Sequence, residues 1–238
     1  MAVQSKTSGV LWALKWYFES KNLALKNASA FRCPLAVEQQ MEMRQYYGTY
    51  LSCLISATEL LLEREYPHKD QFKHAIEQAL ASTAFPNGAD NYQYLRELRN
   101  AVIHRGLDIC SAAHIDGAIP VVIAPSPVPN RTGQQSCQSF GYYLRDVISQ
   151  CEAVIGPTIA DHLQTMGLLN ATVNPNEAIA EMKNAIREST VMPDWVKAMA
   201  LADNTINSVD FVKVEETRIE QLVELLRLNA ATKHSLYG

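Results

Sequence analysis

Long apolar runs and a strong excess of charge of either sign are both missing from this chain. Its 21 Lys and Arg against 25 Asp and Glu give a formal net charge of −4. That balance excludes a protein coated in positive charge to hold nucleic acid, although it leaves room for a local basic site. The longest uncharged interior stretch in a helical segment, residues 45–58, is too short to span a bilayer. The apolar run at residues 9–14 lacks a signal-peptide cleavage site, so we expect a cytoplasmic protein with no membrane partner.

Paired cysteine motifs are also absent. The five cysteines are Cys33, Cys53, Cys110, Cys137 and Cys151. Their number is odd and no two are spaced as CxxC, which argues against a disulfide framework and a zinc knuckle. His68 and His74, with Asp70 between them, lack the tight spacing of metal ligands. We therefore expect free thiols, no bound metal and no cofactor.

Apolar residues make up 47% of the 238 residues, enough for a sizeable core. They recur at helical intervals over most of the chain, as Leu51, Leu54 and Ile55 do. Apart from residues 92–106, helices are expected over residues 8–28, 35–66, 69–83, 138–166, 175–189, 193–204 and 208–229. The pattern predicts a mostly all-α fold.

Residues 107–137 differ in character from the rest. An apolar stretch at residues 118–124 is followed by a proline-rich segment at residues 125–133, which indicates an extended stretch and a stiff loop, or one small hairpin. We expect a helical bundle over residues 1–166 that includes this insertion. Residues 167–238 are expected to form a helical extension packed on the same domain.

The segment Tyr92–Gly106 carries the most informative residues. It holds Arg96, Arg99 and Arg105 but only one acid, Glu97, so its formal charge is 3 − 1 = +2 on an acidic chain. A positive patch of substrate size is consistent with this charge, whereas a broad non-specific DNA groove is not.

The ends of this segment are typical of a helix. Asp90 is a candidate N-cap, with Gln93 placed three residues later as in a capping box. Gly106 is a candidate C-terminal stop. Leu95, Leu98 and Val102 are expected on the buried side.

Two side chains in this helix suggest phosphodiester chemistry. Arg99 stays charged and can donate two hydrogen bonds to phosphate oxygens, and His104 can exchange a proton near neutral pH. Five helical steps place the two about 140° apart. Asn100 and Arg96 instead share a side with His104. The alternative is that Arg99 forms a surface ion pair and that His104 interacts with the C-terminal helix dipole.

The phrase LRELRNAVIHRG resembles the motif helix of HEPN domains, which are small helical bundles that include many RNA-cleaving toxins and defence nucleases. Asn100 follows the arginine, so the match is to the R-N-x-x-x-H form of the motif. The resemblance covers about residues 91–106. One subgroup of the family, paired with nucleotidyltransferase antitoxins, has a tyrosine where this chain has Gly106.

The resemblance implies a metal-independent RNA endonuclease of a bacterial toxin or antiviral defence system. His104 would act as general base on the ribose 2′-hydroxyl or as general acid on the leaving oxygen. Arg99 would neutralise the phosphorane-like transition state, and Asn100 would orient His104 or bind the phosphate. Arg96 and Arg105 would bind flanking phosphates of the RNA. The family usually forms a homodimer with facing motif helices, and an antitoxin or regulatory protein is a possible further partner.

Other interpretations remain open at this point. The chain is alternatively a non-catalytic HEPN-like helical module that binds a partner protein or a nucleotide, or a regulatory subunit that senses a nucleotide phosphate. Glu59 and Glu63, four residues apart, either support His104 or form a solvated helix face. The tyrosines of two neighbouring pairs either stack on bases or pack at the core and its rim; they are Tyr92, Tyr94, Tyr142 and Tyr143.

Overall fold

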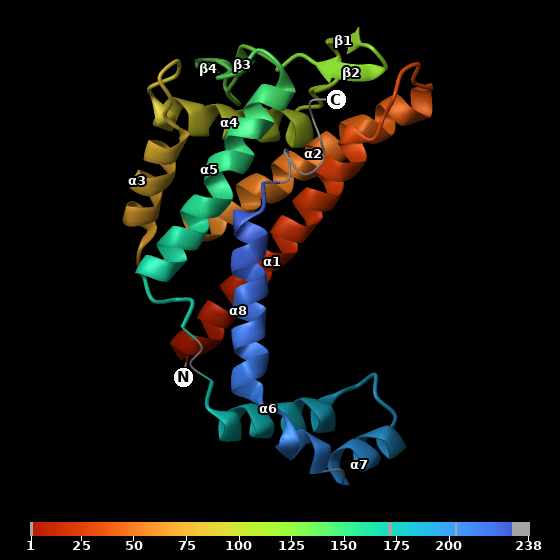
Figure 1. The fold of residues 1–238 in the computed structure, drawn as a ribbon, viewed down its shortest axis with the longest axis vertical. Helices are drawn as coiled ribbons and strands as arrows, with labels where there is room; N and C mark the ends of the chain where they lie inside the picture. Colours follow the sequence, from red (N-terminus) through yellow and green to blue (C-terminus); the bar gives the residue numbers. More distant parts are fainter. Residues whose placement is uncertain (1, 171–172, 203, 230–238) are drawn as a thin grey trace.

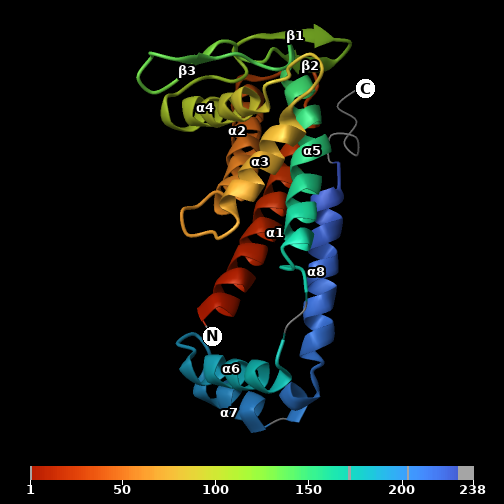
Figure 2. The ribbon, with the colours of Figure 1, turned by 90° about the vertical axis from the view of Figure 1, so that its left-hand side faces the viewer.

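The computed structural model describes residues 2–170, 173–202 and 204–229. This part of the chain is mostly helical, as predicted, with two small β-hairpins. Figures 1 and 2 show the hairpins at one end of a bundle of long helices, and the short helices α6 and α7 at the other end. No helix in the described ranges is both long enough and apolar enough to cross a membrane.

The long helices α1 (Ala2–Ser29) and α2 (Val37–Leu60) pack along each other. α5 (Leu144–Thr165) lies against α3 (Lys69–Leu80), and α8 (Phe211–Arg227) packs on both α1 and α5. Their inward side chains form one continuous core, to which α1 contributes Leu14 and Phe18 and α5 contributes Ile155 and Ile159. Burial of these apolar faces is the main force that holds the helices together.

α4 (Gly88–His104) packs against α2 and α3 and lies beneath the β3–β4 hairpin (Figure 2). α2 and α4 approach closely at Gly48, where an added Cβ would lie 3.3 Å from Val102 Cγ1. At the start of α4, Gly88 touches the backbone carbonyl of Glu77 in α3. The contact at Gly88 leaves no room for a side chain, so it fixes where α4 crosses α3, whereas at Gly48 the Val102 side chain would have to shift by a few tenths of an ångström.

Residues 107–137 form two antiparallel hairpins, where the sequence indicated at most one. β1 (Ala113–Asp116) pairs with β2 (Ile119–Val122), and β3 (Val128–Pro129) pairs with β4 (Ser136–Cys137). Pro129 is the last residue of the two-residue strand β3. At that position its missing backbone N–H interrupts no longer run of hydrogen bonds between the strands. The proline-rich segment is therefore part of the second hairpin.

α6 (Pro175–Glu188), α7 (Asp194–Ala202) and the 3-10 helix η1 (Asn204–Ser208) contact one another, and α6 also contacts α8. Neither α6 nor α7 contains a buried residue. Within the described residues, this part of the chain joins the bundle mainly through α8, whose Leu222 and Leu226 are buried.

Several helix ends differ from the predicted ones. The helix predicted over 35–66 ends at Leu60, because residues 61–68 form a series of turns. α4 begins at Gly88, and its N-cap is Asn87 rather than Asp90: the Asn87 side chain accepts a hydrogen bond from the Asp90 backbone N–H. An asparagine is as good a cap as an aspartate, so residue preference could not distinguish the two positions.

A buried ionic network connects α1, α2 and α5. Lys21 Nζ lies 2.8 Å from both carboxylate oxygens of Glu152, and the Tyr50 hydroxyl donates to Glu152 Oε1 at 2.8 Å. The three side chains are almost fully buried. Burial lowers the pKa of Lys21 and raises the pKa of Tyr50, while the neighbouring Glu152 acts to raise both. An ion pair buried this deeply is stable only while both charges are present.

We expect Lys21→Met to destabilise the protein by about 3–5 kcal/mol, because it leaves the Glu152 carboxylate buried without its counter-charge. Urea unfolding followed by circular dichroism measures the loss. The double variant Lys21→Met/Glu152→Leu removes both charges and should recover more than half of that free energy. Equal destabilisation of the single and double variants would contradict this account of the network.

Candidate functional site

α4 presents a buried face and a polar face, and the polar face carries the motif. Leu95, Leu98 and Ala101 are buried against the bundle, whereas Val102 is only partly buried. The Asn87 cap satisfies a backbone N–H in the first turn and fixes where the helix starts. The buried stripe then decides which way each polar residue of α4 faces.

His104 is the last residue of α4, and its side chain is exposed. The chain turns away immediately afterwards at Gly106, whose φ of +72° favours glycine. The backbone N–H groups of Arg105 and Leu107 both donate to the carbonyl of Ala101, which closes the helix end. His104 has no hydrogen-bond partner among the residues that the structure describes, so its imidazole is free to meet a ligand.

Arg99 is held by a carboxylate from α2. Its Nη2 lies 2.6 Å from Glu59 Oε1, and its side chain is only 14% exposed. Arg96 reaches the same oxygen from one turn earlier, with its Nε at 3.7 Å. Glu59 was a candidate support for His104; instead it contacts the two arginines. The ion pair expected under the alternative interpretation of Arg99 is therefore present, although it is largely shielded from solvent.

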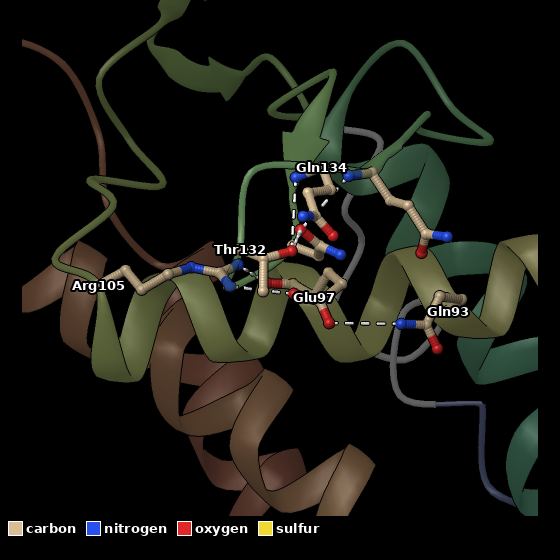
Figure 3. A network of polar contacts seen from close by, with 7 residues as sticks. Gln93, Glu97, Arg105, Thr132 and Gln134 are labelled. Carbon is tan, nitrogen blue, oxygen red and sulfur yellow. Dashed lines mark hydrogen bonds and ion pairs between the residues drawn. The ribbon is translucent and has the colours of Figure 1, made fainter.

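Arg105 is also paired. Its Nη1 donates to Glu97 Oε2 at 3.0 Å and its Nη2 donates to the Glu97 backbone carbonyl at 2.9 Å. Figure 3 shows Arg105 and Gln93 approaching Glu97 from its two sides, with Thr132 and Gln134 of the second hairpin close by. Of the two predicted phosphate-binding residues, Arg105 is thus bound to Glu97, whereas Arg96 keeps a side chain that is 44% exposed.

The fold brings together only part of the predicted constellation. Arg96 and Arg99 meet at Glu59, and Asn100 lies half-buried one turn before His104 on the side of the helix that they share. Arg99 and His104 remain about 140° apart around α4, because the helix continues without a break to His104. Within one protomer, the arginine and the histidine therefore face different directions.

Two acidic residues of this region could not be assigned a partner from the sequence. Glu59 lies 40 positions before Arg99, so only the packing of α2 on α4 identifies the pair. Glu97 lies four residues after Gln93, a spacing that signals a helix-surface contact, and the two side chains do form a hydrogen bond at 3.3 Å. The pairing of Glu97 with Arg105, eight residues later, has no such signal.

The four tyrosines divide into two groups. The Tyr92 hydroxyl is buried beside Thr58 Oγ1 at 2.8 Å, and the Tyr94 hydroxyl donates to the Pro125 carbonyl at 3.0 Å. These two are core residues and are not available to bases. Tyr142 is 67% exposed and packs edge-on against Tyr143, which is partly buried, so Tyr142 is the accessible member of the second pair.

All five cysteines are free thiols. In the described part of the chain, no three His, Cys, Asp or Glu side chains are grouped so that they could hold a metal ion.

Comparison with protein-family models, curated proteins and solved structures finds no match to this chain.

We expect Glu59→Gln to lower the free energy of unfolding by about 1 kcal/mol, because it leaves the shielded Arg99 guanidinium without its counter-charge. The loss should shrink in high salt, where the wild-type ion pair is itself screened. Glu63→Gln is the matched control, since Glu63 is exposed one turn later in the chain and should change stability by less than about 0.5 kcal/mol. Equal effects of the two substitutions in urea unfolding would argue against a structural Arg99–Glu59 pair.

Proposed function

We propose that this protein is a metal-independent RNA endonuclease of the HEPN type, in which two copies of α4 face one another. The exposed, unpartnered His104 at the end of the motif helix is the observation that carries the proposal. An imidazole in that position can reach a ribose and exchange its proton with solvent between turnovers. The toxin or antiviral setting rests on the resemblance of residues 91–106 alone.

The ion pair of Arg99 with Glu59 is compatible with phosphate binding, because it uses only some of the guanidinium N–H donors. Glu59 occupies the terminal nitrogen Nη2 of the guanidinium, and Nε is buried, so the other terminal nitrogen is the one left to meet a phosphate. A guanidinium has five N–H donors, so one carboxylate does not exhaust it. Glu59 would hold the planar group in a fixed orientation, and the remaining donors would stabilise charge on the phosphorane-like transition state.

A second copy of the chain resolves the angular separation of Arg99 and His104. When two motif helices face one another, the arginine of one protomer can act on the phosphate whose ribose meets the histidine of the other. His104 as general base takes the proton of the 2′-hydroxyl while the 2′-oxygen attacks phosphorus. The bond from phosphorus to the 5′-oxygen breaks, and a protonated His104 supplies the proton to that leaving oxygen. The products are a 2′,3′-cyclic phosphate and a 5′-hydroxyl end.

The remaining motif residues would have binding roles. Asn100, on the same side of α4 as His104, would orient the imidazole or donate to the phosphate. Arg96, with the more exposed side chain of the Glu59 pair, would contact a flanking phosphate. Arg105 would need to leave Glu97 to do the same, so we expect it to contribute less to RNA affinity than Arg96.

A non-catalytic module that binds a partner protein or nucleotide is the second candidate. The observation that favours it is the pairing of all three arginines of residues 92–106 with carboxylates, those of Glu59 and Glu97. Such pairing lowers the local positive potential that would attract RNA. On this interpretation, α4 is a structural helix and His104 is a surface residue.

The decisive test is cleavage of total cellular RNA by the purified full chain in excess EDTA. We expect chelator-resistant cutting that leaves 5′-hydroxyl ends, and a loss of at least about 100-fold in His104→Ala and in Arg99→Ala. His74→Ala is the matched control, because His74 is exposed on α3, outside the motif helix, and should keep full activity. All variants should retain the helical circular dichroism of the wild type.

Two results would contradict the proposal. Cutting that stops with EDTA would point to a metal-dependent nuclease. A folded, dimeric wild-type protein that cuts no RNA would favour the partner-binding module.

A further inference from the structure

Residues 61–68, the turn segment that joins α2 to α3, are fastened to α5 by a cluster of rings. The Tyr66 hydroxyl and His162 Nε2 form a hydrogen bond at 2.9 Å. The ring centroid of His68 lies 6.5 Å from that of His162, and the centroid of Phe72 in α3 lies 5.1 Å from it. Tyr66, His68 and Phe72 therefore surround the imidazole of His162, and we call these four side chains the ring cluster.

His162 is the buried member of the cluster. It lies in the last turn of α5, and it is only 6% exposed. A buried imidazole is most stable without a proton, because a charged ring would lose its hydration there. The contact between the turn segment and α5 is therefore suited to a neutral His162.

The groups that face His162 from the turn segment are themselves uncharged or basic. They are the Tyr66 hydroxyl and the His68 imidazole. The charged residues of that segment are exposed to solvent; they are Glu63, Arg64 and Glu65. Burial first, and His68 second, lower the pKa of His162. A proton on His162 is thus opposed both by desolvation and by a second imidazole.

The helices packed beside His162 leave this balance unchanged. α3 faces it with the Phe72 ring and with the polar side chain of Gln71, which lines the same groove. On α5 itself, the neighbouring Asp161 is paired with Arg227 of α8 at 2.6 Å. That groove, with a volume of about 530 Å³, lies between α3 and α5, which are in contact along their length (Figure 1). Because His162 lines an open groove, protons from solvent can reach its imidazole.

We propose that the ring cluster is a pH-sensitive latch, in which protonation of His162 detaches residues 61–68 from α5. The proton places a charge on a buried ring beside His68, and detachment lets both imidazoles reach water. The Tyr66 hydroxyl can donate to a neutral imidazole and accept from a charged one. The latch therefore opens because a charge is buried, and the loss of this hydrogen bond is not its cause.

The direction of the pH dependence follows from the two states of His162. In the open state its pKa has the ordinary value of about 6.5, whereas in the closed state its pKa is lower. The open state therefore binds the proton more tightly. The closed latch keeps its full stability above about pH 6.5 and loses it progressively as the pH falls below that value.

The latch is connected to the motif helix through α2. The backbone N–H groups of Leu61 and Leu62 donate to the carbonyls of Thr58 and Glu59, at 3.1 and 3.0 Å, so the turn segment continues from the last turn of α2. Glu59 also holds Arg99 in α4. Detachment of the segment would therefore loosen the end of α2 that carries the counter-charge of Arg99. The latch does not depend on the proposed cleavage of RNA.

The test is backbone hydrogen exchange by mass spectrometry on the full chain, corrected for the intrinsic effect of pH on exchange. We expect peptides covering residues 58–68 to exchange several-fold, and at most about tenfold, faster at about pH 5.5 than at about pH 7.5. The reason is that only the open state binds the proton readily. Peptides from α1 are the internal reference, and their exchange should change by less than about twofold.

Three variants assign the effect to the ring cluster. His162→Gln is neutral at both pH values, so the acid-induced opening should disappear. His68→Gln removes the second imidazole, and the pKa of His162, followed by NMR of the imidazole protons, should rise toward its ordinary value. His74→Gln is the matched control, because His74 is exposed on α3, and it should open in acid as the wild type does. Circular dichroism checks that each variant is folded, and His68→Gln keeps the test decisive where His162→Gln does not fold.

Three results would overturn the latch. The first is equal exchange of residues 58–68 at the two pH values. The second is acid-induced opening that persists in a folded His162→Gln protein. The third is a wild-type His162 that titrates at or above about 6.5. None of these measurements uses RNA, so failure of the latch and failure of the nuclease proposal are separate outcomes.

Discussion

The buried contact of Lys21 with Glu152 and Tyr50 is the constraint on which the rest of the fold depends. It joins three helices that are far apart in sequence, and neither charge reaches water. The desolvation of these charges is compensated only when α1, α2 and α5 lie in one arrangement. An apolar core alone tolerates helix sliding far better, because hydrophobic contacts have no direction. The network therefore fixes the position of α2, against which the motif helix packs.

α2 in turn supplies the carboxylate that partly neutralises two arginines of the motif helix. Its last turn places Glu59 against Arg99 and Arg96, and its Gly48 admits the close approach of Val102. The result is a helix whose cations are oriented but already partly neutralised, with one free imidazole at its end. Under the proposed function, a second copy would have to bring its own arginine and histidine to complete the site, because Arg99 and His104 of one protomer face different directions.

Residues 107–137, which follow α4, form two hairpins at the same end of the molecule (Figure 1). The first hairpin joins the α1–α2 loop to the start of α5, and residues from these three distant segments line one pocket. The second hairpin lies close to Glu97, the residue that pairs with Arg105 (Figure 3).

The sequence by itself determined the helical class, the existence of α4 and the burial of its Leu95 and Leu98, because these follow from local periodicity and turn chemistry. It also predicted where the motif helix ends, since Gly106 is a glycine stop. Only the tertiary structure decided that Glu59 holds Arg99, that Glu97 holds Arg105, and that Arg32 and Arg145 line one pocket. These pairs join residues that are distant in sequence or lack a helical spacing. Their contacts depend on how helices and hairpins pack, and periodicity carries no information about that.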